Sequence, residues 1–205
     1  MKYVLFVHFD QPAHVLLPRA QAELGLHISR MRDFHAQGTL LMSGAFRTPA
    51  EPLSTMGVFR TREAAEAFAH GDPFILQGMA RGWQIREWQE IVPEPDPDSP
   101  GAQLAVKHVL LFATAYASIE EAYAQAPGEI ARHVARSQEF QAMGSLLMAG
   151  AFAGADQLLE TMAIVTSRQA AEEYAAGDPF VLNGMVTSWH IREWNDVVAQ
   201  PPEPA

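Results

Sequence analysis

The sequence predicts an α+β protein in which two ferredoxin-like β-α-β-β-α-β repeats follow one another along one chain. The first observation is an internal duplication, because the stretch Gly71–Met79 returns as Gly177–Met185 in the same register. The second is the alternation, within each repeat, of short strand-like runs with stretches of helical periodicity. The third is the period of about 100 residues, which is the size of a domain and excludes a solenoid of short units.

Each element of the first repeat follows from its residue pattern. Lys2–Phe9 is rich in Val, Phe and Tyr, which predicts a strand. Apolar residues recur at three- and four-residue spacing over Arg19–Gln37, which predicts an amphipathic helix that starts at Pro18 and ends before Gly38. The following elements are two strands, a helix capped by Thr61, a short helix and a last strand: Thr39–Phe46, Thr55–Arg60, Arg62–Ala69, Pro73 to Gly78 and Trp83–Val92.

The second repeat has the same order from about Lys107 to Val198. Between the repeats, alternating Pro and acidic residues exclude a helix or internal strand and favour extended polyproline II. We therefore expect a first domain, a linker, a second domain and a frayed tail, over residues 1–92, 93–105, 106–198 and 199–205.

Helices on one side of a four-stranded sheet would leave the other side apolar and exposed. Two such sheets can bury these faces against each other, so we expect a fused pseudo-dimer within one chain. Further homo-oligomerisation stays open at this level.

The composition limits the partners of the protein. The formal net charge is −10 and no basic run offsets it, which argues against nucleic acid or an anionic membrane as partner. No apolar run approaches the length that spans a bilayer, and the N-terminal run is too short for a signal peptide. Cysteine is absent, which excludes disulfides and thiolate chemistry and fits a location in the cytoplasm.

Among the eight histidines, only His27 and His133 occupy the same place in both repeats. Each lies in the middle of the first predicted helix of its repeat, where an imidazole could serve as general acid or base. A buried histidine with a purely structural role explains the position equally well. No His-x-x-x-His or His-x-His pair supports a metal site, and no dinucleotide fingerprint is present, so we expect no metal and no cofactor.

Asp72 and Asp178 are the second group that both repeats share. An Asp before Pro is a strong helix N-cap, because the carboxylate accepts amide hydrogen bonds while Pro starts the helix. The same carboxylate could hold an imidazole N–H, since it has two oxygens. The sequence does not choose between these roles. Arg30 and Arg136, one turn after each His, could attract an anionic ligand or simply lie exposed on the helix.

These motifs, in this order and present twice, resemble the YCII-related (YciI-like) domain family. In the first repeat they are His27, Leu40 to Gly44, Ala64-Ala65 and Asp72-Pro73-Phe74; in the second they are His133, Leu146 to Gly150, Ala170-Ala171 and Asp178 to Phe180. The resemblance implies an intramolecular dimeric α/β barrel with a candidate active site in each repeat, formed by His27 with Asp72 and by His133 with Asp178. The family includes a dehydrochlorinase that acts on a chlorinated hydroxyquinol. This chain has Gly44-Ala45-Phe46 and its repeat where a Gly-Pro step is usual, so the loop over the pocket, and with it the substrate, is expected to differ.

Three hypotheses about function follow. The first is a lyase, isomerase or hydrolase that uses each His–Asp pair for general acid/base catalysis on a small molecule. The second is a non-catalytic small-ligand-binding or interaction module, in which His and Asp are structural. The third is that one site works while the other has drifted, because loop residues differ between the repeats, as Arg47 does from Ala153 and Arg81 from Thr187.

Overall fold

The computed structural model describes residues 1–47, 50–152 and 158–199. Residues 200–205 of the tail predicted over 199–205, and parts of the loops that follow the second strand of each repeat, lie outside the described residues. Position 153, one of the loop positions that differ between the repeats, is among them.

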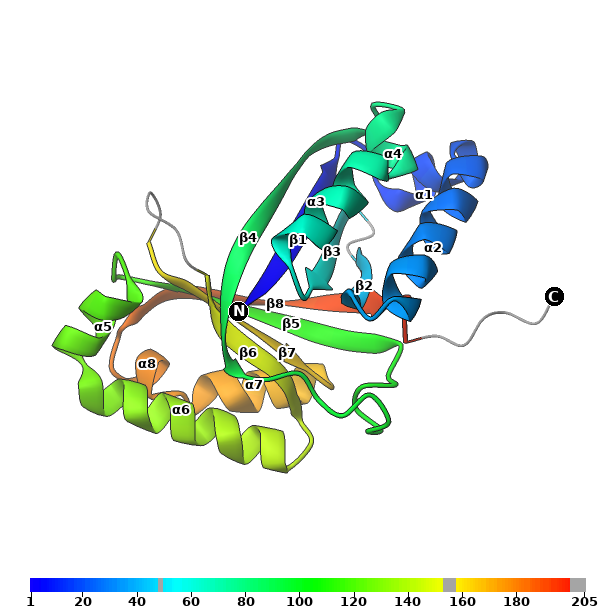
Figure 1. The fold of residues 1–205 in the computed structure, drawn as a ribbon. Helices are drawn as coiled ribbons and strands as arrows, with labels where there is room; N and C mark the ends of the chain where they lie inside the picture. Colours follow the sequence, from blue (N-terminus) through cyan, green and yellow to red (C-terminus); the bar gives the residue numbers. More distant parts are fainter. Residues whose placement is uncertain (48–49, 153–157, 200–205) are drawn as a thin grey trace. The chain divides into compact units, whose positions relative to one another are not determined.

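The first repeat contains the predicted β-α-β-β-α-β order (Figure 1). Its elements are β1 (Lys2–Phe9), α1 (Ala13–Leu16), η1 (Leu17–Arg19), α2 (Gln21–Ala36), β2 (Leu40–Phe46), β3 (Ser54–Phe59), α3 (Arg62–Gly71), α4 (Pro73–Leu76) and β4 (Ala80–Val92). Thr61 caps α3 as predicted, because its side chain accepts a hydrogen bond from the amide of Ala64 at 3.1 Å.

The second repeat has the same order. Its elements are β5 (Val106–Thr114), α5 (Ile119–Gln125), α6 (Pro127–Ala142), β6 (Leu146–Phe152), β7 (Glu160–Val165), α7 (Arg168–Ala176), α8 (Pro179–Leu182) and β8 (Val186–Asp196). Ser167 caps α7 in the way that Thr61 caps α3, through the amide of Ala170 at 3.1 Å.

Two local predictions need correction. Pro18 does not start the long helix as predicted: it lies in the turn η1, which follows α1, and α2 begins at Gln21. The segment 93–105 forms neither helix nor strand, as expected, but turns replace extended polyproline II over residues 97–103. Polar groups explain these turns: Asp96 Oδ1 accepts from the amide of Asp98 at 2.9 Å, and Lys107 Nζ donates to the carbonyl of Ala102 at 2.9 Å.

The chain divides into two compact units, and their boundaries fall within the last strands of the repeats. One unit comprises Met1–Arg86 and Trp194–Ala205, and the other comprises Glu87–Glu193. The first unit therefore holds the C-terminal end of β8, where Gly44 of β2 pairs with Asp196 and Phe46 with Trp194. The second unit holds the C-terminal end of β4, where Trp88 pairs with Phe152 of β6.

Each unit has its own antiparallel ladders. In the first unit β3 pairs with both β1 and β2, and in the second β7 pairs with both β5 and β6. Because β4 and β8 each contribute to both sheets, the hydrogen-bonded strand order closes into the eight-stranded barrel β1-β3-β2-β8-β5-β7-β6-β4. This closed strand order confirms the predicted barrel.

Within each unit the long helices cover one face of the sheet and enclose a core. Figure 1 shows α2 and α3 beside β1, β2 and β3, and α6 and α7 beside β5, β6 and β7. Residues such as Leu5, Met31 and Phe68 form the core of the first unit, and Leu110, Phe140 and Tyr174 belong to that of the second. Burial of these apolar side chains supplies the main stabilisation and fixes α2 and α6 over their sheets.

Candidate active site in each repeat

The structure brings His27 and Asp72 together in the first unit. His27 projects from α2, and its Nδ1 is hydrogen-bonded to Oδ2 of Asp72, the residue that precedes α4. The other carboxylate oxygen, Oδ1, accepts hydrogen bonds from the amides of Phe74 at 3.0 Å and Ile75 at 3.4 Å. Asp72 therefore caps the helix with one oxygen and holds the imidazole with the other.

The second unit repeats this geometry. His133 on α6 lies with Nδ1 2.6 Å from Oδ2 of Asp178, and Oδ1 of Asp178 accepts from the amide of Phe180 at 2.8 Å. The two pairs differ in exposure: the His27 side chain is 15% exposed and the His133 side chain 5%. Both carboxylates are almost fully buried, which favours a short, charge-assisted hydrogen bond.

The pairing fixes how each imidazole can act. An ionised carboxylate only accepts hydrogen bonds, so the Nδ1 of the histidine must carry the proton that Asp accepts. In the neutral imidazole, Nε2 then has a free lone pair and can take a proton from another group. When Nε2 is protonated, the adjacent carboxylate stabilises the imidazolium charge. Each pair thus has the arrangement of a general base whose tautomer is set by a buried acid.

The residues just before Asp72 contact Arg30 of α2, and this contact explains why Gly71 precedes the aspartate. Arg30, one turn after His27, donates from Nε to the carbonyl of Phe68 at 3.2 Å and from Nη2 to that of Ala67, at the C-terminal end of α3. A Cβ at Gly71 would overlap the Arg30 guanidinium, so glycine leaves the space that this arginine occupies. One face of α2 therefore contacts the junction of α3 and α4 twice. Arg30 binds the end of α3, and His27 binds Asp72 at the start of α4.

The second repeat uses the same contacts. Arg136 donates from Nε to the carbonyl of Tyr174 at 3.1 Å and from Nη2 to that of Glu173 at 2.6 Å. Gly177 leaves room for its guanidinium as Gly71 does for Arg30. The idea that these arginines attract an anionic ligand receives no support from this geometry, because their N–H groups are directed to helix-end carbonyls, where a cation is favoured.

Aromatic rings surround both histidines. The His27 ring meets the rings of Phe68 and Phe74 edge-on, at centroid distances of 5.8 and 5.2 Å. The His133 ring instead stacks on Phe180 at 4.3 Å, with an interplanar angle of 10°. These contacts restrict ring rotation, so Nε2 of each histidine keeps one direction relative to its sheet.

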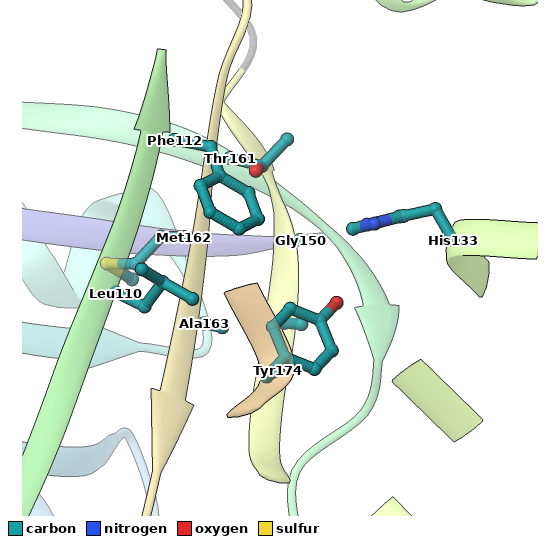
Figure 2. Close-up of a pocket in the computed structure, with 9 residues that line it drawn as sticks. Leu110, Phe112, His133, Gly150, Thr161, Met162, Ala163 and Tyr174 are labelled. Carbon is teal, nitrogen blue, oxygen red and sulfur yellow. The ribbon is translucent and has the colours of Figure 1, made fainter. Parts of the chain in front are cut away.

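A small cavity lies beside His133, between α6 and the sheet of the second unit. Its volume is about 10 Å³, and its lining residues are Leu110, Phe112, His133, Ala149, Gly150, Thr161, Met162, Ala163 and Tyr174. Figure 2 shows the His133 ring extending from α6 toward the strands that carry Gly150 and Thr161. His133, whose Nδ1 is bound to Asp178, is one of the residues that line this space.

Two hydroxyl groups distinguish the second site from the first. Ser137 Oγ donates to the carbonyl of His133 at 2.9 Å, and it lies 2.6 Å from the Tyr174 hydroxyl. Burial raises the pKa of Tyr174 above its ordinary value, and the nearby Asp178 charge acts in the same direction, so the phenol stays neutral. The equivalent positions of the first repeat are Met31 and Phe68.

Ser137 and Tyr174 are not among the site residues predicted from the sequence. A signal was present, because both positions change from apolar to hydroxyl-bearing between two repeats that otherwise match closely. A new side-chain hydrogen bond needs both a donor and an acceptor, so two such changes are expected to occur together. Spatial contact was needed to see that the two changes belong together, since they lie 37 residues apart.

Two features typical of other protein classes are absent from the described part of the chain. It holds no group of three or more His, Cys, Asp or Glu side chains arranged to bind a metal ion. None of its described helices combines the length and hydrophobicity needed to cross a bilayer.

The fold and the site define a class of protein: a closed α/β barrel of two repeats, each with a histidine held by a helix-capping aspartate. The YCII-related domain model matches the chain twice, over residues 1–89 and 108–195. The chain therefore belongs to the YCII-related domain family, with two tandem copies. A search of curated protein sequences found no match.

Solved structures with similar folds have little sequence in common with this chain. A proposed monooxygenase from Lactobacillus acidophilus aligns with a TM-score of 0.59 at 11% identity, covering 96% of this chain and 94% of its own. A heme-binding protein from Thermus thermophilus has a TM-score of 0.58 at 12% identity, with coverage of 95% and 90%. A proposed chlorite dismutase has a TM-score of 0.60 at 8% identity, with coverage of 97% and 95%. At these identities the likeness shows the fold alone.

Proposed function

We propose that the protein is a small-molecule enzyme in which His27–Asp72 and His133–Asp178 act as general acid/base pairs. The observation that carries the proposal is the division of labour in each carboxylate, where one oxygen caps a helix and the other holds Nδ1 of the histidine. Helix capping alone does not require an imidazole. The imidazole contact is present in both repeats, which argues that both His–Asp pairs serve the same chemistry. Family membership and the barrel fold support a small-molecule ligand.

The reaction class follows from what such a pair can do. A neutral imidazole with a free Nε2 removes a proton, and the resulting imidazolium returns it, which serves a lyase, an isomerase or a hydrolase. The aromatic rings around His27, the more exposed of the two histidines, favour an apolar or aromatic substrate. Within the same proposal the reaction needs no cofactor, and the two repeats work as a fused pseudo-dimer with one site each.

A heme has to be considered because one structural neighbour is a heme-binding protein. Histidine Nε2 is a common heme ligand, but the cavity at His133 has a volume of only about 10 Å³. A macrocycle would require the sheet and α6 to separate. The residues around His133 therefore do not fit this group, and no step of the proposed reaction involves it.

The test is the pair of substitutions Asp72→Asn and Asp178→Asn, made singly and together. Asn is also a good N-cap, so the helices should persist, while the negative charge beside the imidazole is lost. Once a screen of small aromatic and anionic compounds has found a turnover, we expect the double variant to lower kcat by about 10²- to 10⁴-fold. Circular dichroism and thermal melting monitor the fold.

Asp96→Asn is the matched control, because it makes the same change in a turn outside the site. The alternative function is a non-catalytic ligand-binding module, which the low exposure of His133 favours. In that case the Asp→Asn variants would change stability or ligand affinity and leave any turnover intact. Unequal losses in the two single variants would show that one site has drifted from the other.

A further inference from the structure

Besides the exposure and ring contacts of the histidines, the two sites differ in the hydroxyl pair Ser137–Tyr174, which lies beside His133. Its proton positions can be deduced. Ser137 has one hydroxyl proton, and it is donated to the carbonyl of His133, one turn earlier on α6. The hydrogen bond between Ser137 and Tyr174 must then use the phenolic proton of Tyr174. The Tyr174 oxygen keeps its lone pairs as hydrogen-bond acceptors.

These lone pairs belong to a residue that lines the same cavity as His133. In its neutral form His133 contributes a second acceptor, because Nδ1 then carries the proton given to Asp178 and Nε2 keeps a lone pair. Thr161 adds a hydroxyl to the lining, and Figure 2 shows it on the wall that the His133 ring faces. The other lining residues are Leu, Phe, Ala, Gly and Met, whose side chains add no hydroxyl, amide or charged group.

The size of the cavity limits the occupant. A volume of about 10 Å³ corresponds to roughly one water molecule. A buried water is stable where two to four polar groups surround it, and His133, Tyr174 and Thr161 provide three. Water also has two protons to give, which matches the two acceptors that His133 and Tyr174 present.

We propose that the second site holds one water molecule between Nε2 of His133 and the hydroxyl oxygen of Tyr174, and that Tyr174 is its positioning residue. This inference rests on the proposed function, in which His133 then has a water in place to deprotonate. It assigns water-using chemistry, hydration or hydrolysis, to the second site. The first site has Met31 and Phe68 at these positions and lacks the anchoring hydroxyl, so its proton transfer acts on the substrate directly.

High-resolution crystal structures of the wild-type chain and of Tyr174→Phe test the proposal. We expect a water peak within hydrogen-bond distance of both His133 Nε2 and Tyr174 Oη in the wild type, and its loss in the variant. Phenylalanine is the natural residue at position 68 of the first repeat, so the fold should accept it. A wild-type cavity without water, or a water that keeps its place in Tyr174→Phe, would overturn the proposal.

Nitrogen NMR of histidine-labelled protein gives a second measurement that does not need crystals. The Nε2 resonance of His133 should shift in Tyr174→Phe, while that of His27 stays in place as an internal control. In the reverse double variant Met31→Ser with Phe68→Tyr, the Nε2 resonance of His27 should shift instead. An unchanged His133 resonance in Tyr174→Phe counts against the water.

Neither measurement depends on turnover, so the two proposals can fail separately. A water bound as described, with no dependence of any turnover on Asp72 or Asp178, would sustain the water site and refute the proposed function. A dry cavity with strongly Asp178-dependent turnover would refute the water site alone.

Discussion

At the residue scale, Asp72 and Asp178 resolve a choice that their sequence context left open. An Asp-Pro step is explained either by helix capping or by a partnership with histidine, and the geometry shows both contacts at once. A serine or threonine cap has one oxygen and no charge, so it could not bind the imidazole and cap the helix equally well. The carboxylate is the side chain that meets both requirements.

His108 offers a pH-dependent test at the same scale. Burial lowers its pKa from the usual 6.5, while Glu193 and Glu172 act to raise it and Arg168 to lower it. The unfolded chain therefore takes up a proton at His108 near pH 6.5, and the folded chain only at lower pH. The free energy of unfolding that this residue contributes is present above pH 6.5 and is lost as the pH falls toward the lower folded pKa.

We expect His108→Tyr to reduce the loss of Tm between pH 7.5 and 5.5, as measured by thermal melting. Tyrosine is the residue at the matching ladder position of the first repeat, where Tyr3 pairs with Phe59 as His108 pairs with Val165. Tyr3→Phe serves as the control, since it alters the matching position without a group that titrates near neutral pH. An equal loss of Tm in wild type and His108→Tyr would contradict the assignment.

At the element scale, the spacing His-x-x-Arg on α2 and α6 determines which neighbours these helices can have. Residues three apart lie on one face, so His27 and Arg30 both reach the junction of α3 and α4. The Gly-Asp-Pro-Phe motif at that junction supplies the space, the carboxylate, the helix start and the aromatic contact in order. One short motif thus positions the helix and the histidine together.

The glycine within β2 gives an element-scale prediction. A Cβ at Gly44 would overlap the backbone carbonyl of Asn195, where the end of β8 pairs with β2. Gly44→Ala should therefore lower the free energy of unfolding by more than about 2 kcal/mol, because backbone cannot move aside as a side chain can. Urea denaturation followed by circular dichroism measures the change.

Gly25→Ala is the matched control for this prediction. Gly25 lies in α2, and a Cβ added there would have no atom within 4 Å, so alanine should stabilise the helix by up to about 1 kcal/mol. The structure thus predicts that Gly44→Ala lowers the free energy of unfolding and that Gly25→Ala raises it. A Gly44→Ala variant as stable as wild type would show that β8 does not approach β2 in this way.

At the scale of the whole molecule, the repeats and the compact units are different divisions of the chain. The repeats follow the order of the sequence, whereas each unit includes the C-terminal end of the last strand of the other repeat. Trp194, at the end of β8, is fully buried and pairs with Phe46 of β2. A single repeat therefore lacks part of the sheet to which its own β2 belongs.

We expect residues 1–92 expressed alone to be unfolded or to self-associate, because β2 would have an open edge without Trp194–Asp196. Size-exclusion chromatography and circular dichroism measure this. Co-expression of residues 1–98 with 99–205 is the control, since it breaks the chain between the repeats and keeps every strand. A monomeric, cooperatively folded 1–92 would contradict the prediction.

The sequence by itself determined the element order, the duplication and the two His–Asp candidates, because these depend on periodicity, capping and repetition within about 100 residues. Only the tertiary structure decided three further points: both oxygens of Asp72 and Asp178 are used, β4 and β8 each serve two units, and Ser137 joins Tyr174 beside His133. Each is a contact between groups far apart along the chain. Such contacts depend on where helices and strand ends come to lie in three dimensions, which local residue patterns do not specify.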